Sequence, residues 1–236
     1  MRLAAPHAWN VSPAEARAIQ ADLAGRVELR DAITLDQIET VAGIDNTYLT
    51  FDGQALACAV VVMLTFPQLD EVEMRVAWRP VTFPYVPGLL SFREGPAVLA
   101  ACAELENNPD LLLFDGQGYA HPRRLGLASH LGILLDRPSI GCAKSRLVGS
   151  YEEPEREFGA WTPLLVGGDV VGAAVRTRPR HKPLFVSPGH RVTVDTAVEI
   201  TLACCRNGNF LPEPTRLAHE IVTRERRARL AASATS

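Results

Sequence analysis

Two short apolar runs restrict the fold more than any other feature of this sequence. They are "LLLF" at 111–114 and "SIGCA" at 139–143, and the residues between them, at 123–136, have apolar positions at helical spacing. A strand, a helix and a second strand predict a right-handed crossover between parallel strands. Asp115 follows the first run and Lys144 follows the second. Because sites form at the carboxyl ends of parallel strands, we expect both side chains at one functional edge of a sheet.

The first part of the chain has the pattern of antiparallel strands. Two strand-like runs flank Asp52-Gly53, which is a hairpin signal, and residues 70–81 alternate between apolar and charged side chains. A rigid loop is expected at 83–96, where proline and glycine recur. The other expected elements are helices at 12–24, 97–107, 193–206 and 214–232 and strands at 169–177 and 183–188. The predicted fold class is α/β: a mixed sheet of three antiparallel strands followed by parallel strands, flanked by helices.

Composition fits one domain over residues 1–236. Of the 236 residues 47% are hydrophobic, which is enough for a sizeable core. The net charge of −3 argues against a protein that coats nucleic acid by bulk charge, although a local basic face remains compatible with it. No stretch reaches the roughly 18 apolar residues of a membrane span. Most of the five cysteines lie in apolar runs. We therefore expect reduced thiols and a cytoplasmic protein with no membrane partner.

Three carboxylates stand at positions where an ordinary core would not place them. Asp45 interrupts the strand-like run "VAGIDNTY", Glu94 lies near a helix start, and Asp115 ends "LLLF". Each has a simpler interpretation alone: an exposed strand residue, a capping box Ser91-x-x-Glu94, and a turn residue. Together they predict hard oxygen ligands for Mg²⁺ or Mn²⁺, as two-metal phosphodiester cleavage requires. Lys144 could then hold a phosphate or the attacking water, although a solvated lysine is the simpler interpretation.

Six longer motifs resemble those of the endonuclease V family. In chain order they are "VAGIDNTY", "PYVPGLLSFREGP", "FDGQGYAHPRRLGLASHLG", "PSIGCAKSRLVG", "SPGHRVTVDTA" and "LPEPTRLAH". The resemblance covers roughly residues 12–225, in order and without large gaps. It implies an RNase H-like fold and a repair nuclease for the deaminated base hypoxanthine. Residues 226–236 match no family motif, and we expect a flexible tail there.

The resemblance also implies roles for single residues. The positions that match the family's metal-binding residues are Asp45, Glu94, Asp115 and His219. Lys144 matches the family's active-site lysine, and His121 matches a histidine near the scissile strand and the flipped base. The positions that match substrate contacts are Tyr85, as a wedge that fills the gap left by an extruded base, and Leu90, Gly116, Gly118 and Leu147, as the pocket for that base. Gln117 is a small departure, because some relatives carry histidine there.

Two arginines follow His121 directly. We expect Arg123 and Arg124 to face phosphate, because arginine near a helix N-terminus is unfavourable for the helix dipole and suggests an anionic partner. A solvated helix start is the alternative interpretation.

The resulting expectation is a monomeric, Mg²⁺-dependent DNA repair endonuclease, with Mn²⁺ as a substitute. As in the family it resembles, it should recognise deoxyinosine and cut the second phosphodiester bond 3′ to the lesion, leaving 3′-hydroxyl and 5′-phosphate ends. An endoribonuclease specific for inosine in RNA is the nearest alternative, and the two would differ in contacts to the 2′-hydroxyl. A non-catalytic inosine-binding protein is disfavoured, because clustered carboxylates without a metal would repel a polyanion.

Overall fold

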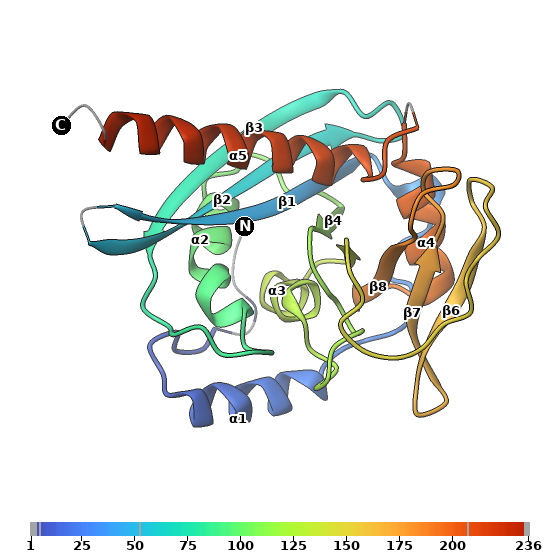
Figure 1. Cartoon of the computed structure of the whole chain (residues 1–236), viewed down its shortest axis with the longest axis horizontal. Helices are drawn as coiled ribbons and strands as arrows, with labels where there is room; N and C mark the ends of the chain where they lie inside the picture. Colours follow the sequence, from blue (N-terminus) through green and yellow to red (C-terminus); the bar gives the residue numbers. More distant parts are fainter. Residues whose placement is uncertain (1–3, 5, 52, 207, 234–236) are drawn as a thin grey trace.

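The computed structural model describes residues 4, 6–51, 53–206 and 208–233. The strands of this part of the chain form one mixed sheet in the order β3-β2-β1-β4-β5-β8-β7-β6 (Figure 1). Their bounds are β1 (Thr40–Phe51), β2 (Gln54–Thr65), β3 (Glu71–Pro80), β4 (Leu111–Phe114), β5 (Ser139–Ala143), β6 (Trp161–Val166), β7 (Asp169–Val175) and β8 (Leu184–His190). The mixed sheet flanked by helices confirms the fold class predicted from the sequence.

The order of the strands agrees with the prediction in its first five members. β1, β2 and β3 form an antiparallel meander, and β4 and β5 then continue the sheet in parallel with β1. Asp52, at the expected hairpin turn, lies outside the described residues. The last three strands differ from the prediction, because β8 runs antiparallel to β5, and β7 and β6 continue antiparallel. Apolar runs indicate that a strand is buried but carry no information on its direction.

Strand β6 was not expected at all. It pairs with β7 at the edge of the sheet, has one isolated bridge from Leu165 to Ser150, and contains Pro163. Three of its six residues are exposed, and only Leu164 is buried. Edge strands tolerate proline and need little apolar surface, so they leave a weak signal in the sequence.

The helices largely follow the expected ranges. Their bounds are α1 (Pro13–Ala24), α2 (Ser91–Ala103), α3 (Leu127–Leu135), α4 (Val194–Ala203) and α5 (Glu213–Ser233), with one turn of 3₁₀-helix at Leu35–Gln37. The capping box of α1 forms as predicted: Ser12 Oγ accepts from Glu15 N, and the Glu15 carboxylate accepts from Ser12 N at 2.8 Å.

Helix α2 begins six residues earlier than its sequence suggests. Pro96 favours a start after the loop, since proline inside a helix removes one hydrogen bond. In the structure the helix includes Pro96, and Leu90 occupies its N-cap position without a side-chain cap. Buried Phe92 anchors this first turn in a cluster with Phe83 and Leu89. Burial of such a side chain stabilises the fold by about 1.5–3 kcal/mol, which offsets the missing bond.

Both faces of the sheet are covered. Helices α4 and α5 pack on one face, where α5 lies along β1 and β2 (Figure 1), and α2 and α3 pack on the other. Strand β4 lies between these layers, and all four of its residues, 111–114, are fully buried. Helix α1 packs outside α3. None of the helices in the described ranges is long and apolar enough to cross a bilayer.

Helix α5 extends past the expected end of the core. It continues through Ser233, close to the helix end predicted at residue 232 and beyond residue 225, where the family motifs end. Arg226 donates from Nε to the main-chain oxygen of Tyr48 at 2.9 Å. The guanidinium of Arg229 lies over the rings of Phe51 and Trp78, with distances of 5.1 and 5.0 Å from its central carbon to the ring centroids. These contacts tie the basic segment to the sheet, in a part of the chain where a flexible tail was expected.

Candidate active site

The three central strands bring the predicted polar residues together. Asp45 lies within β1, Asp115 follows β4, and Lys144 follows β5. The parallel register pairs Ile44 with Phe114, and Asp115 N donates to the main-chain oxygen of Ile44 at 2.9 Å. Asp45 and Asp115 therefore become neighbours as a direct result of strand pairing. The site lies at the carboxyl ends of β4 and β5, as the sequence predicts.

His219 joins these residues from α5. Its Nδ1 lies 2.7 Å from Asp45 Oδ2 and 3.9 Å from Asp115 Oδ2. One ligand atom from each of Asp45, Asp115 and His219 falls within a group whose members are no more than 4.8 Å apart. Lys144 Nζ lies 2.5 Å from Asp115 Oδ2 and 3.3 Å from His219 Nδ1. Two carboxylates, an imidazole and an ammonium group thus meet at one point.

Glu94, from α2, lies in the wall of a cavity that Asp45 and Asp115 also line, but it is not part of the group formed by Asp45, Asp115 and His219. Asn46 Nδ2 donates to its Oε2 at 3.5 Å, and the residue is only 7% exposed. The early start of α2 makes this possible, because Glu94 is the fourth residue of the helix and not a capping residue. Gly95 is also needed here, since a Cβ at that position would lie 2.5 Å from the ring of Trp9. The structure excludes the capping-box interpretation of Ser91 and Glu94.

In the metal-free protein, burial disfavours the charged forms of the Glu94 and Asp45 carboxylates. Burial, together with the charges of Asp45 and Asp115, raises the pKa of Glu94 to about 8, against the opposing effect of the Tyr48 hydroxyl. Burial and the charge of Asp115 raise the pKa of Asp45 to about 6. Such shifts mean that the charged forms lack sufficient compensation from the protein alone. A cation at the cluster would supply it.

A cavity of about 240 Å³ opens beside the carboxylates. Its wall contains eight of the predicted site residues: Asp45, Tyr85, Leu90, Glu94, Asp115, Gly116, His121 and Leu147. Tyr85 is 73% exposed, and Leu90 and Leu147 are also exposed. Large side chains that remain exposed around a cavity are typical of a binding site. Residues 85–90, the strand ends and α2 together form this cavity.

His121 lies in the same wall but is buried. It is 5% exposed, and its Nδ1 accepts a hydrogen bond from Arg123 N at 3.2 Å. Burial and the neighbouring charge of Arg123 lower the pKa of His121 to about 4. The imidazole is therefore neutral at physiological pH, with one ring nitrogen committed to the main chain.

The two predicted pocket glycines have different surroundings. Gly116 lines the cavity, and a Cβ there would meet only Leu127, at 3.7 Å. Gly118 is absent from the cavity wall; a Cβ there would lie 2.2 Å from the main-chain oxygen of Pro188, and its N–H donates to Ser187 Oγ at 2.9 Å. β8 occupies the space beside Gly118, so a role for this glycine in the pocket stays a prediction.

Neither predicted phosphate-binding arginine stands at a helix start. Arg123 donates from Nη2 to the main-chain oxygen of Gly88 at 2.6 Å and from Nε to the Gln20 side chain. Arg124 has a left-handed backbone with φ of 55°, and its Nη2 lies 3.3 Å from Asp169 Oδ2. Both arginines bind protein groups, and α3 begins only at Leu127. The structure gives no support to the expected phosphate contact.

Several residues of the site were not found by sequence reasoning. Gln20 is 1% exposed and donates to the main-chain oxygens of Gly88 and Leu125, at 3.0 and 2.8 Å. Asn46 and Ser91 also line the cavity. Gln20 appeared only as a polar position in the predicted helix at 12–24. A polar residue on a helix face gives no signal of its distant partners in the sequence.

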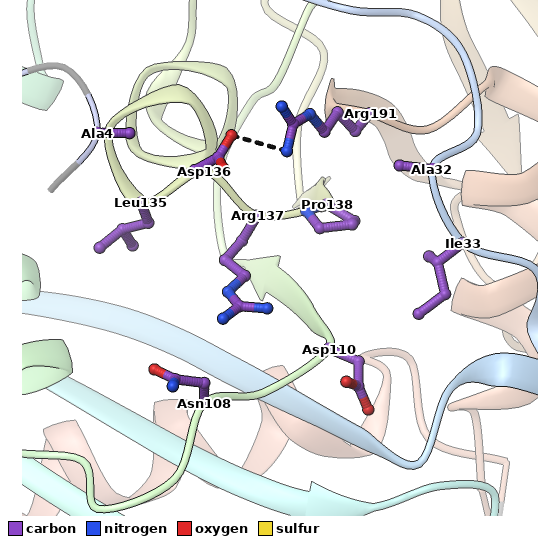
Figure 2. A pocket seen from close by; sticks show the side chains of 10 residues that line it. All are labelled: Ala4, Ala32, Ile33, Asn108, Asp110, Leu135, Asp136, Arg137, Pro138 and Arg191. Carbon is purple, nitrogen blue, oxygen red and sulfur yellow. Dashed lines mark ion pairs between the residues drawn. The ribbon is translucent and has the colours of Figure 1, made fainter. Parts of the chain in front are cut away.

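A second and larger cavity lies at the opposite ends of β4 and β5 (Figure 2). It measures about 1100 Å³, and Asp110 and Pro138, which precede the two strands, are in its wall. Its acidic groups have partners: Asp110 Oδ2 accepts from Thr40 N at 2.9 Å, and Asp136 pairs with Arg191 at 2.7 Å, as the dashed line in Figure 2 marks. None of the predicted site residues lines this second cavity.

Comparison with known proteins identifies the family. The model of the family described as Endonuclease V matches residues 21–220. The chain is 50% identical over 226 residues to endonuclease V of Gloeobacter violaceus, covering 95% of this chain and 91% of that protein. It is 53% identical over 218 residues to endonuclease V of Roseiflexus sp., covering 92% and 95%.

This chain belongs to the endonuclease V family.

Solved structures of the family have the same fold. Endonuclease V from Bacillus subtilis superposes with a TM-score of 0.94 at 32% identity, covering 98% of this chain and 100% of that chain. Endonuclease V from Ciona intestinalis, in complex with a 24mer DNA containing an inosine followed by a ribo-adenosine, has a TM-score of 0.77 at 27% identity, covering 91% and 98%. The resemblance stated from the motifs is confirmed, and the chain is a nuclease of this family.

Proposed function

We propose that this protein is a Mg²⁺-dependent DNA repair endonuclease that recognises deoxyinosine. It cuts the second phosphodiester bond 3′ to the lesion and leaves 3′-hydroxyl and 5′-phosphate ends. The observation that carries this proposal is the continuity of the 240 Å³ cavity with the acidic cluster, since Asp45, Glu94 and Asp115 are part of its wall. This cavity is smaller than the roughly 300–1,000 Å³ of drug-sized ligand sites, which suits a single base.

The donor set fits a hard divalent cation. Asp45 and Asp115 would supply carboxylate oxygens and His219 one nitrogen, and Glu94, in the wall of the same cavity, would add a third carboxylate; these ligands suit Mg²⁺, with Mn²⁺ as a substitute. The metal would stabilise charge that develops on the phosphate and activate the attacking water. The raised pKa values of Asp45 and Glu94 support this assignment, because the metal would favour the ionised forms that burial disfavours.

Two protein groups would assist the metal. Lys144 Nζ, 2.5 Å from Asp115, is close enough to orient the Asp115 carboxylate and to hold a phosphate oxygen. His121 is neutral, its Nδ1 accepts from Arg123 N, and the ring lies in the cavity wall, so we assign it to a contact with the strand at the cavity.

The exposed wall of the cavity suits an extruded nucleotide. A base cannot be inspected inside the duplex, so it must leave the stack, at a cost of a few kcal/mol. Tyr85, between Pro84 and Pro87 on a stiff loop, is available to fill the gap, because most of its ring is in solvent. Leu90, Gly116 and Leu147 would then pack around the base.

The outer face of α5 offers further positive charge near the site. Arg224 and Arg227 are exposed and line a groove that begins at His219. This groove runs away from the metal-binding residues along one side of the helix. We assign it to the backbone of the strand that flanks the cut.

An endoribonuclease specific for inosine is the second candidate. The Ciona intestinalis protein is seen with DNA that carries a ribo-adenosine after the inosine, so a ribonucleotide is accommodated beside the lesion in that relative. The test compares cleavage of matched DNA and RNA strands, each with one inosine, in Mg²⁺. Faster cutting of DNA supports the proposal, and cutting of RNA alone would replace it with the second candidate.

A further inference from the structure

A chain of hydrogen bonds leads from the cavity to the N-terminal segment. Ser91, in the cavity wall, has its Oγ 2.8 Å from His130 Nδ1. His130 is fully buried in α3, and its Nε2 lies 2.7 Å from His7 Nε2. His7 Nδ1 in turn lies 2.8 Å from the main-chain oxygen of Ala8. Four residues from three separate parts of the chain are thus linked in series.

The last acceptor fixes the direction of every bond in this chain. A carbonyl oxygen can only accept, so His7 Nδ1 carries a hydrogen and donates to Ala8. In a neutral imidazole the other nitrogen is then an acceptor, so His7 Nε2 accepts from His130 Nε2. His130 Nδ1 must therefore accept as well, and the donor to it is the hydroxyl of Ser91.

Both histidines are neutral at physiological pH. Burial lowers the pKa of His7, and burial together with the neighbouring His7 lowers the pKa of His130 to about 3. The rings also pack against Trp9 and Phe92, with centroid distances between 4.4 and 5.8 Å across the cluster. The tautomers are therefore held by an apolar shell as well as by the terminal carbonyl.

The direction of the chain determines what Ser91 can offer to a ligand. Its only hydroxyl proton is committed to His130, so Oγ can act toward the cavity solely as an acceptor. The main-chain N–H of Ser91, the first residue of α2, has no acceptor among the residues that the structure describes. An acceptor and a donor thus stand side by side on one residue.

We propose that Ser91 is a specificity-determining residue that accepts a hydrogen bond from the N1–H of extruded hypoxanthine, with His130 and His7 as positioning residues. This inference rests on the function proposed above. Hypoxanthine has a hydrogen on N1 and an oxygen at C6, which complement Oγ and the N–H of Ser91. Adenine has a lone pair on N1 and an amino group at C6, so both contacts become unfavourable. Guanine shares the N1–H, and Ser91 does not exclude it.

The test compares two DNA strands that differ in one base. One carries deoxyinosine, and the other carries unsubstituted purine, which has a lone pair on N1 and nothing at C6. The quantity measured is the ratio of kcat/KM for the two strands in Mg²⁺. In Ser91→Ala the ratio should fall by about tenfold, because the inosine contact is lost while the purine strand is little affected. Ser129→Ala is the matched control: it removes a neighbouring buried hydroxyl that has no partner, and the ratio should stay unchanged.

The positioning role has its own variant. His7→Phe keeps a ring beside Trp9 and Phe92 but removes the last link, so His130 can change tautomer and the Ser91 hydroxyl can turn into a donor. The ratio should fall in the same direction, by a smaller factor. A ratio that falls in Ser91→Ala but not in His7→Phe would overturn the role of the histidines.

An unchanged ratio in Ser91→Ala would overturn the inference as a whole. If Ser91→Ala does not fold, His7→Phe decides alone, and an unchanged ratio there would have the same meaning. A wild-type protein that cuts neither strand would contradict the proposed function instead, so the two failures are distinguishable.

Discussion

The two ends of the parallel strands β4 and β5 carry cavities of opposite character. At the amino ends the cavity is larger, about 1100 Å³, and its acids have partners within the protein (Figure 2). Asp110 caps the main chain of Glu39 and Thr40, with hydrogen bonds of 3.0 and 2.9 Å. At the carboxyl ends the cavity is about 240 Å³, and it is lined by Asp45, Glu94 and Asp115.

The difference lies in whether the acids serve folding. Thr40 and Glu39 satisfy the carboxylate at the amino end, so that carboxylate stabilises the start of β1. The carboxylates at the other end are crowded and poorly compensated, as the raised pKa values of Asp45 and Glu94 indicate. Folding alone would not retain such a cluster. We therefore propose that the smaller cavity is the functional one, although it is not the larger of the two.

Replacing one acid at each end should have opposite consequences: loss of activity at the carboxyl end and loss of stability at the amino end. Asp115→Asn should reduce cleavage by about 10³-fold or more, because a metal ligand and the partner of Lys144 are lost, and should leave the melting temperature nearly unchanged. Asp110→Asn should reduce the free energy of unfolding by about 1–2 kcal/mol with little effect on cleavage. Nicking rates and thermal melts of both variants check this. Similar losses of activity in both variants would remove the distinction between the two ends.

The stability of the metal-free protein should depend on pH through the carboxyl-end cluster. Glu94 has a folded pKa of about 8, above its unfolded value, so its contribution to stability is fully present below about pH 4 and is lost as pH rises toward 8. In EDTA, unfolding free energy should fall by about 2 kcal/mol or more between pH 5 and 8.

Two changes should flatten this pH dependence. Glu94→Gln removes the titrating group, and saturating Mg²⁺ replaces the proton as the partner of the cluster. Urea titrations at several pH values measure the slope. An equally steep slope in Glu94→Gln would show that another group is responsible.

The exposed wall of the small cavity should be dispensable for folding. Tyr85→Ala should leave the melting temperature nearly intact, because the side chain is 73% exposed. It should reduce cutting at inosine in duplex DNA by about tenfold, and cutting in a single strand should suffer less, since less stacking must be broken there. Tyr85→Phe, which keeps the ring, is the control and should retain most activity. A variant that melts early yet cuts both substrates in the wild-type ratio would identify Tyr85 as a packing residue.

Basic residues at the two ends should differ in their effect on salt dependence. Arg224→Ala with Arg227→Ala should weaken binding to DNA of any sequence and lower the log–log salt slope by about 0.9 for each phosphate contact removed. Arg137→Ala, in the wall of the amino-end cavity, is the matched control and should leave the slope unchanged. Equal slopes in all three proteins would show that the α5 groove does not follow the nucleic acid.

The residues that could be predicted from sequence are those placed by strand pairing. Asp115 and Lys144 follow two buried apolar runs, and Asp45 interrupts a third. Because parallel strands end at the same edge of a sheet, the proximity of these side chains could be predicted. Glu94 lies in the cavity wall beside Asp45 and Asp115, but the local structure around it differs from the prediction. Its helix begins earlier because the burial of Phe92 outweighs the hydrogen bond lost at Pro96.

The contacts that could not be predicted join distant segments. Gly118 packs against Pro188. Arg123 binds Gly88, which is 35 residues away in the sequence, and Gln20, which is 103 residues away. No local pattern encodes such partners. The link between Ser91 and His7 belongs to the same class, since each residue looks like an ordinary polar position until the chain is folded.

Cleavage of two strands that differ at one position tests the central claim most directly. One end-labelled DNA strand carries a single deoxyinosine, and the other carries deoxyadenosine in its place; each is incubated with wild-type protein in Mg²⁺ and in EDTA. The account predicts one product, from the inosine strand in Mg²⁺ only, cut at the second phosphodiester bond 3′ to the lesion. Equal cutting of both strands, or cutting that persists in EDTA, would contradict it.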